Sequence, residues 1–318
     1  MLQFKSLQDV IIRFSDEKTC IAYLEQMRWN GKPECTHCGC SKVYRCGSVN
    51  QPYKCGDRFC GKKFSVKIGL IFEDSKVPLS KWFMAIYLNS AHKKGISSLQ
   101  LGKDINVTQQ TAWFMLMRIR EMMRVKQPVK AMNIVEVDET YVGGKMKNKH
   151  NKVRSQYKKE DGYLSGHAGN KVGVMGLIER DKKSVTVKVI DSTKQTLKDM
   201  VKEHVDLSAT VITDSLMAYR GLANSFATHE IIHHEKNEFV RGEIYTNTVE
   251  GFFSLLKRSI FGIYHQVSPK HLARYCDETA YRYNHREIKD NERFVLTLEN
   301  AAGRLKYQQL IKKYSAAL

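Results

Sequence analysis

Six of the eight cysteines in this 318-residue chain fall between Cys35 and Cys60, and this density restricts the local fold more than any other feature. They include two close pairs, "CTHC" with Cys35 and Cys38 and "CGDRFC" with Cys55 and Cys60, separated by sixteen residues. Two such pairs can close two knuckles around one metal, and four thiolates favour Zn²⁺ in a closed tetrahedral site. Disulfides are the weaker explanation, because the chain is long and shows no secretory signal. The pattern therefore predicts a zinc ribbon.

The ligand set has alternatives within the same stretch. Cys40 and Cys46 are also available, and the second pair has four spacer residues where two are commoner. Buried free thiols would not explain six cysteines in 26 residues. Lys62, Lys63 and Lys67 follow directly, so this unit is expected either to contact DNA or to carry a solvated basic face.

Helical periodicity flanks the cysteine-rich unit on both sides. A Ser15/Asp16 cap starts one amphipathic helix that ends near Trp29, and "PLSKWFMAIYLNSAHKKG" predicts another. The next segment, "ISSLQLGKDINVTQQTAWFMLMRIREMMR", predicts a helix, a turn around Asp104–Val107 and a second helix over Thr108–Met122. This order of elements is typical of a helix-turn-helix.

The second of these helices is then the candidate recognition helix. Gln109, Gln110 and Arg118 are expected to face DNA, because glutamine and arginine carry the donors that base edges and phosphates accept. The alternative is a helical hairpin that only links two domains.

Beyond about residue 130 the pattern changes to alternating strands and helices. "NIVEVDE" and "KVGVMGLIERDKKSVTVKVID" predict strands, the second segment with a turn at Arg180–Lys183. A helix ("TKQTLKDMVKEHV"), a strand ("ATVITDS") and another helix ("TNTVEGFFSLLKR") follow, which favours a mixed α/β domain of the catalytic type. We therefore expect a helix at 1–30, a zinc ribbon at 31–75, a helix-turn-helix-like DNA-binding segment at 76–130, the α/β domain at 131–290 and a helical tail at 291–318.

Two aspartates end apolar runs in this domain, and a glutamate lies on the helix that follows them. Asp138 ends "IVEVD", Asp214 ends "TVITD", and Glu250 comes 36 residues after Asp214. Three carboxylates from two strand ends and a helix can hold two Mg²⁺ or Mn²⁺ ions, which keep water and substrate phosphates as other ligands. Two such ions activate an attacking oxygen and stabilise the leaving oxygen in phosphodiester displacement.

Other residues compete for this role. Glu136 points to the same strand face as Asp138, and Glu139 follows Asp138 directly. Asn247, one turn before Glu250, is an alternative or additional ligand. Glu160 is a further competing acid, and the strand-ending Asp191 is a weaker candidate.

Cations accompany the acid on the helix. Glu250 and Lys257 are seven residues apart, about two helical turns, so both project from nearly the same face. We expect Glu250 to face a metal while Lys257, with Arg258 beside it, contacts DNA phosphates. The basic stretch Lys145–Lys159 is expected either to clamp DNA or to be a solvated loop.

The charge balance indicates the class of partner. Lysine and arginine number 52 against 33 acids, a formal charge of +19, and this excess favours nucleic acid as the polyanion. No apolar run approaches the roughly 18 to 20 residues of a membrane span. We therefore expect a cytoplasmic protein with no membrane partner.

The motifs as a set resemble a known family. Over nearly its whole length the chain is similar to insertion-sequence transposases that have an N-terminal zinc ribbon and an RNase H-like DDE catalytic domain. The resemblance rests on "CTHCG", "YKCGDRFCGKKFSV", "VEVDETYVGGK", "ITDSLMAYRGL" and "YTNTVEGFFSLLKRSIFGIYHQVSPKHLARYCDETAYRYNHR".

This resemblance implies residue roles, an activity and partners. Asp138, Asp214 and Glu250 would form the metal-binding triad, and Lys257 would be the lysine that follows it by seven residues. The protein would bind the terminal repeats of its element, cleave DNA with metal-activated water and join the freed 3′-OH to target DNA. It is expected to act as a homo-oligomer on DNA in a bacterial nucleoid. The spacing of Cys55/Cys60 is wider than the family's usual two residues.

Two other functions would use some of the same motifs. A DNA-binding regulator with a zinc ribbon and a helix-turn-helix would keep the α/β domain for assembly alone, and would not need the three acids. A nuclease with a histidine pair or a tyrosine nucleophile is the other possibility. "IIHHEKNE" places His233 and His234 directly adjacent. Two histidines on the same strand face must instead be separated by one residue. We expect these histidines to be structural or to face DNA.

Overall fold

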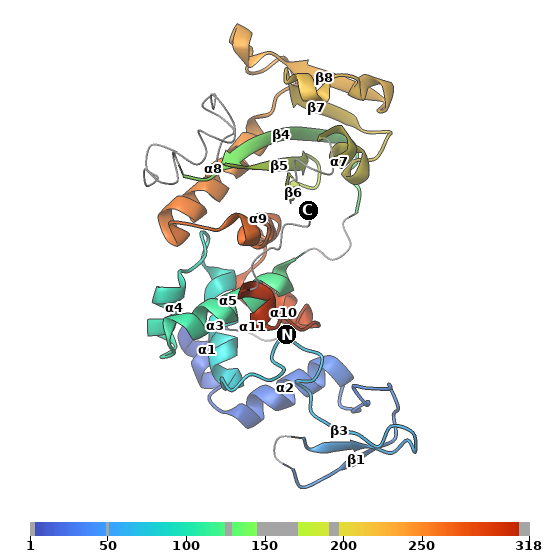
Figure 1. The fold of residues 1–318 in the computed structure, drawn as a ribbon, viewed down its shortest axis with the longest axis vertical. Helices are drawn as coiled ribbons and strands as arrows, with labels where there is room; N and C mark the ends of the chain where they lie inside the picture. Colours follow the sequence, from blue (N-terminus) through green and yellow to red (C-terminus); the bar gives the residue numbers. More distant parts are fainter. Residues whose placement is uncertain (1–3, 49–50, 125–128, 145–170, 191–196, 312–318) are drawn as a thin grey trace, which may run out of the picture. The chain divides into compact units, whose positions relative to one another are not determined.

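The structure is a computed structural model, and it describes residues 4–48, 51–124, 129–144, 171–190 and 197–311. It divides into two compact units, Met1–Met123 with Ile288–Leu318 and Arg124–Glu287 (Figure 1). The C-terminal segment, expected as a separate tail, thus clusters with the N-terminal unit. Among the described residues, no helix combines the length and apolar character that crossing a membrane requires.

The cysteine-rich part of the first unit forms a small antiparallel sheet. Its strands β1 (Val43–Arg45), β2 (Tyr53–Cys55) and β3 (Lys63–Phe64) pair in this order. Among the residues that the structure describes, four buried ones make up its core: Cys35, Tyr53, Cys55 and Phe64. So small a core needs support from a bound metal.

The rest of the first unit is helical. Its helices are α1 (Leu7–Arg13), α2 (Glu17–Trp29), α3 (Leu79–Ala91), α4 (Ser98–Asp104), α5 (Gln109–Met123), α10 (Asp290–Glu299) and α11 (Tyr307–Ile311). α4, α5 and the turn between them occupy the segment in which the sequence predicts a helix-turn-helix. Each of these two helices has a capping hydroxyl at its start, since Ser97 accepts the N–H of Gln100 and Thr108 accepts that of Thr111.

Arg118 corrects one sequence-based expectation. The residue was expected to face DNA, but it is 5% exposed and lies inside the first unit. Its guanidinium donates to the carbonyl oxygens of Ile71, at 2.5 Å, and Leu305, at 3.1 Å, and it stacks on the Phe114 ring. Arg118 therefore joins distant segments of the first unit and cannot contact DNA.

We expect Arg118→Met to destabilise the first unit by about 2–4 kcal/mol, because it leaves buried carbonyl groups without a donor. Thermal unfolding should show a lower midpoint for this unit. Gln110→Ala, at an exposed position on the same helix, is the control and should unfold like the wild type. An unchanged midpoint for Arg118→Met would contradict the structural role.

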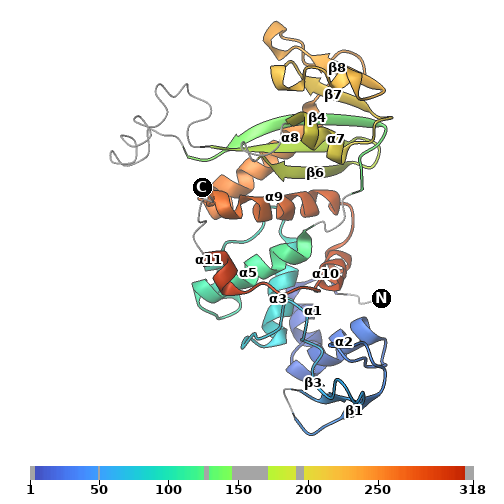
Figure 2. The ribbon, with the colours of Figure 1, turned by 45° about the vertical axis from the view of Figure 1, so that its right-hand side comes forward.

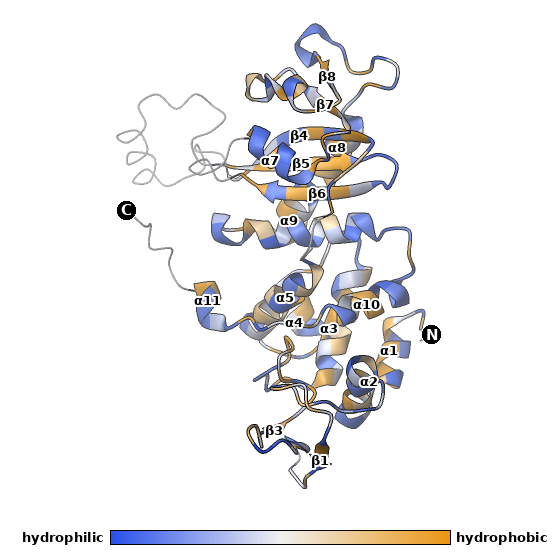
Figure 3. Ribbon diagram, turned by 90° about the vertical axis from the view of Figure 1, so that its right-hand side faces the viewer, coloured by the Kyte–Doolittle hydropathy of each residue, from blue (hydrophilic) through white to orange (hydrophobic). Residues whose placement is uncertain are grey.

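The second unit contains a mixed five-stranded sheet in the order β6-β5-β4-β7-β8. The strands are β4 (Ile134–Val142), β5 (Val172–Glu179), β6 (Ser184–Val189), β7 (Thr210–Asp214) and β8 (Thr228–Ile232). β4, β5 and β6 pair antiparallel, whereas β7 and β8 run parallel to β4. β5 is largely hydrophobic in Figure 3, as a strand covered on both faces should be.

Helices cover both faces of this sheet (Figure 2). α7 (Leu197–His204) packs on one face, and its Met200 and Val201 join the core made by Val135 and Val137 of β4. α8 (Asn247–Ser259), which continues into the π-helical turn Ile260–Tyr264, and α9 (Pro269–Asn284) share a second core with the other face. Short 3₁₀ turns complete the unit: Met217–Tyr219, Leu222–Asn224 and His234–Lys236.

Candidate active site and zinc site

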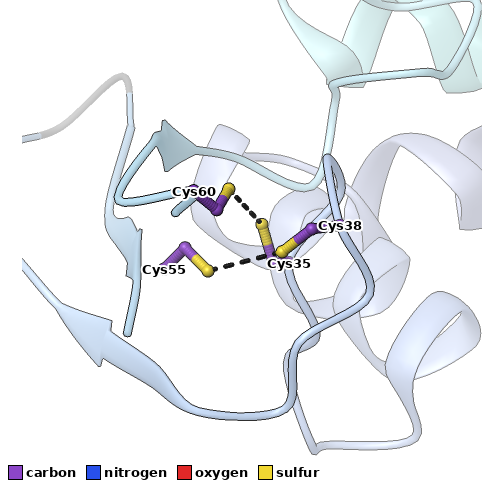
Figure 4. Close-up of side chains that lie close together, drawn as sticks. All are labelled: Cys35, Cys38, Cys55 and Cys60. Atoms are coloured by element: carbon purple, nitrogen blue, oxygen red, sulfur yellow. Dashed lines mark hydrogen bonds between the residues drawn. The ribbon is translucent and has the colours of Figure 1, made fainter. Parts of the chain in front are cut away.

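Four cysteine side chains meet in the ribbon (Figure 4). The sulfur atoms of Cys35, Cys38, Cys55 and Cys60 all lie within 4.8 Å of one another. The Cys35 and Cys60 sulfurs are 3.8 Å apart, and those of Cys38 and Cys55 are 3.6 Å apart. A tetrahedral ion with Zn–S bonds of about 2.3 Å spaces its sulfurs about 3.8 Å apart. The arrangement of the sulfurs therefore fits a zinc ion.

A local turn explains how the wider cysteine pair fits this geometry. In "CGDRFC" the Asp57 Oδ1 accepts the N–H of Phe59 at 2.8 Å and that of Cys60 at 3.0 Å. This Asx turn absorbs the longer spacer and directs Cys60 back to the cluster. Cys40 and Cys46 instead direct their thiols to backbone carbonyl groups. The cysteines that come together are those that the paired pattern predicts.

Carboxylates of β4 and β7 form a second cluster. Asp138, Glu139 and Asp214 each offer an oxygen within 4.8 Å of the others. Glu136 of β4 lies opposite Ile212 of β7, so Asp138 and Asp214, each two residues further along parallel strands, become neighbours. The prediction that Asp138 ends its strand is wrong, because β4 continues to Val142. It is β7 that ends, at Asp214, and this leaves the edge of β4 open beside the cluster.

Burial and like charge raise the pKa values of Asp138 and Glu139. Burial is the main cause that raises the pKa of Asp138 to about 7, and the charges of Glu139, Asp214 and Glu250 add to it. Burial also raises the pKa of Glu139, although a hydrogen bond from Tyr219 acts in the opposite direction. Carboxylates that repel one another in a partly buried site are stabilised by a bound cation. These oxygen donors suit a hard divalent ion such as Mg²⁺ or Mn²⁺.

Glu250 lies close to this cluster but outside its tightest group. It stands in the first turn of α8, and its side chain is 50% exposed. Its Oε1 is 3.5 Å from Nε2 of His234 and 3.5 Å from the hydroxyl of Thr246. The charge of Glu250 adds to the raised pKa of Asp138, and it is the smallest of the neighbouring contributions. The three acids whose oxygens lie within 4.8 Å of one another are Asp138, Glu139 and Asp214. Glu139, and not the expected Glu250, is thus the third member of this group.

The other predicted contact residues are at least partly accessible. On the last turn of α8 Lys257 is half-buried and Arg258 is exposed. Gln109 and Gln110 are exposed at the start of α5. Asn247 is exposed as the first residue of α8.

The competing acids have different positions. Glu136 is completely buried, and its carboxylate accepts backbone N–H groups at the start of α8. It therefore does not compete for a metal. Three further expectations concern residues outside the described part of the chain: Lys145–Lys159, Glu160 and Asp191.

Two residues at the site were not expected there from the sequence. The hydroxyl of Tyr219, which is 1% exposed, donates to Oε2 of Glu139 at 2.7 Å. Nothing but its place in "ITDSLMAYRGL" marked this tyrosine. The pair His233/His234 stood out in the sequence, but only the structure shows that His234 faces Glu250.

We expect Mg²⁺ to raise the unfolding midpoint of the second unit by about 5–10 °C at saturation. The folded-state pKa of Asp138, about 7, lies above its ordinary value of 3.8, so metal-free stability falls as pH rises between these values. Since the metal binds the ionised carboxylates, its stabilising effect should be larger near about pH 8 than near about pH 5. Thermal melts at both pH values, with and without Mg²⁺, measure this difference. An equal shift at both would contradict it.

Comparisons with known proteins agree with this arrangement. Residues 130–284 match the ISXO2-like transposase domain family. Residues 15–63 match the transposase zinc-ribbon domain family, which together with the four-cysteine cluster supports a structural zinc. The chain is also 30% identical, over 255 residues, to an uncharacterised protein in the transposable element ISH50 of Halobacterium salinarum. That alignment covers 77% of this chain and 83% of the relative.

Proposed function

The chain belongs to the ISXO2-like transposases that carry an N-terminal zinc ribbon, and from that premise we propose that it is a metal-dependent DNA transposase. It binds the terminal repeats of its insertion sequence, cleaves phosphodiester bonds at their ends and joins the freed 3′-OH to target DNA. One observation carries the proposal: Asp138 and Asp214 stand side by side on parallel strands, where burial raises the pKa of Asp138 to about 7.

In this proposal the carboxylates of the second unit hold Mg²⁺ or Mn²⁺. Asp138 and Asp214 are the central ligands, and Glu139 and Glu250 supply further oxygens. Two such ions, when bound, activate the attacking oxygen and stabilise the leaving oxygen. Tyr219 orients Glu139 through its hydrogen bond of 2.7 Å, and this fixes the carboxylate before metal and substrate arrive.

Basic and polar residues of both units bind the DNA. Lys257 and Arg258, seven and eight residues after Glu250, contact phosphates beside the cleaved bond. Gln109 and Gln110, exposed at the start of α5, read the terminal repeats. The zinc ion is structural and is held by the four clustered thiolates: Cys35, Cys38, Cys55 and Cys60. The active assembly is a homo-oligomer on DNA.

Strand transfer in vitro tests this function. Purified protein is incubated with DNA that carries the terminal repeats of its element, with target DNA and with Mg²⁺ or Mn²⁺. The proposal expects repeat-dependent, metal-dependent joining of 3′ ends to the target. Tight repeat binding without any cleavage would instead favour the regulator, in which the α/β domain serves assembly.

A further inference from the structure

Glu136 lies on β4 two residues before Asp138, and it is completely buried. The two side chains point to the same face of the sheet, the face that α8 covers. Burying a carboxylate is costly unless its oxygens are well hydrogen-bonded. The partners of Glu136 therefore indicate what the residue does.

Glu136 caps the first turn of α8 from another element. Its Oε2 accepts the N–H groups of Thr248 at 3.0 Å and of Val249 at 3.1 Å, and its Oε1 accepts the Thr248 hydroxyl at 2.8 Å. N–H groups in the first turn of a helix have no partner within the helix. Thr246, the residue before α8, makes no capping hydrogen bond with its side chain. The cap comes instead from a residue 112 positions earlier in the chain.

Arg180, in the turn between β5 and β6, completes this arrangement. Its Nε donates to Oε1 of Glu136 at 2.7 Å, and its terminal nitrogens donate to the carbonyl oxygens of Glu243 and Tyr245. Its guanidinium carbon also lies 3.6 Å from the centre of the Tyr245 ring. The planar fork of an arginine can make all these contacts at once, whereas a lysine cannot. We call Glu136 and Arg180 the α8 clamp.

A glycine allows α8 to approach the sheet beside the same site. Gly176 of β5 lies directly opposite Asp138. A Cβ atom at this position would lie 2.9 Å from the Phe253 ring and 3.1 Å from Val249, both on α8. Even alanine would therefore force the helix or its side chains to move. The clamp and the glycine hold α8 close to Asp138 by independent contacts.

We propose that the α8 clamp positions Glu250 beside the aspartate pair. Glu250 directly follows Val249, whose N–H the clamp holds, so any shift of this turn moves the Glu250 carboxylate with it. Glu136 is thus a positioning residue and not a metal ligand. The consequence for catalysis rests on the proposed function, whereas the consequence for the first turn of α8 does not.

Glu136→Gln tests the clamp while keeping the size of the side chain. Its NH₂ group must face either Arg180 or the helix N–H groups, and so one set of donors loses its acceptor. We expect amide hydrogen exchange in residues 247–252 to become about tenfold faster or more. We also expect cleavage to be roughly 10- to 100-fold slower and to need more Mg²⁺, at unchanged DNA affinity. Exchange mass spectrometry and single-turnover cleavage over a Mg²⁺ titration measure these effects. Arg180→Lys should show both effects to a smaller extent.

Two matched variants control for general damage. Glu179→Gln changes another buried glutamate of the sheet, whose described partner is Lys182. Arg286→Lys changes another arginine that stacks on a tyrosine, Tyr283, and donates to backbone carbonyls outside α8. Both should keep the exchange of residues 247–252 and the Mg²⁺ dependence of the wild type.

The outcomes separate the clamp from the proposed function. A folded Glu136→Gln with wild-type exchange and wild-type Mg²⁺ dependence refutes the clamp, and so does a loss of DNA affinity alone. If the wild type itself does not cleave, the proposed function fails, and the exchange data still decide whether the clamp holds α8. If Glu136→Gln does not fold, Arg180→Lys decides by the same measurements.

Discussion

Asp138→Asn is expected to lower DNA cleavage and strand transfer by about 10³-fold or more, while DNA affinity stays at the wild-type level. In the proposed function Asp138 and Asp214 share a metal ion, and an amide is a much poorer ligand for Mg²⁺ than a carboxylate. The proposed function assigns DNA binding to other residues, so it should persist. Single-turnover cleavage and a DNA titration on the same protein preparation measure the two quantities.

The same variant should be more stable than the wild type in the absence of metal. Burial and neighbouring acids raise the pKa of Asp138 to about 7, so above that pH its charge opposes folding. Asp138→Asn should therefore raise the metal-free unfolding midpoint near about pH 8 and remove the Mg²⁺-induced shift. Asp181→Asn, an exposed acid bonded to Asn133 in the same unit, is the control and should change neither. Cleavage at the wild-type rate by folded Asp138→Asn would refute the metal site.

The aspartate pair shows what the sequence can predict and where its information ends. "IVEVD" and "TVITD" predict two strands with an acid in each, and both strands exist in one sheet. The proximity of Asp138 to Asp214 depends on the register between β4 and β7. These strands are about seventy residues apart in the sequence, with other elements between them. The open edge arises because β7 ends while β4 continues. The apolar pattern of β4 cannot predict where β7 ends.

Arg118 and Glu136 show why the remaining roles were missed. Both are charged residues in segments whose secondary structure the hydrophobic periodicity predicts correctly: Arg118 lies in a helix and Glu136 in a strand. Their partners lie far away in the sequence, however: Ile71 and Leu305 for Arg118, and Thr248 for Glu136. A charged side chain reads as solvent-facing or ligand-binding until its long-range partners are known. The structure assigns both residues to holding segments together.

Removal of the zinc ion is expected to unfold the ribbon and, on the hypothesis that the lysines of the ribbon contact DNA, to weaken DNA binding by about tenfold or more. Structural zinc contributes about 10–16 kcal/mol to the folding of small zinc domains. The sheet of the ribbon is small, because its strands have three, three and two residues and, among the described residues, its core has four buried side chains with partly buried ones packed against them. Hydrogen exchange of residues 35–64 before and after chelation measures the unfolding. The second unit has its own core, so its Mg²⁺-induced shift should remain.

Cysteine substitutions test whether the four clustered thiolates bind the zinc ion that keeps the ribbon folded. Cys38→Ser removes an exposed member of the cluster, and we expect loss of bound zinc and an unfolded ribbon even though no buried side chain changes. Cys46→Ser is the matched control, because this thiol lies outside the cluster and contacts the carbonyl of Gln51 at 3.1 Å. It should keep one zinc ion per chain and the wild-type DNA affinity. Zinc content measured by elemental analysis separates the two variants, and retention of zinc by Cys38→Ser would mean that another residue completes the site.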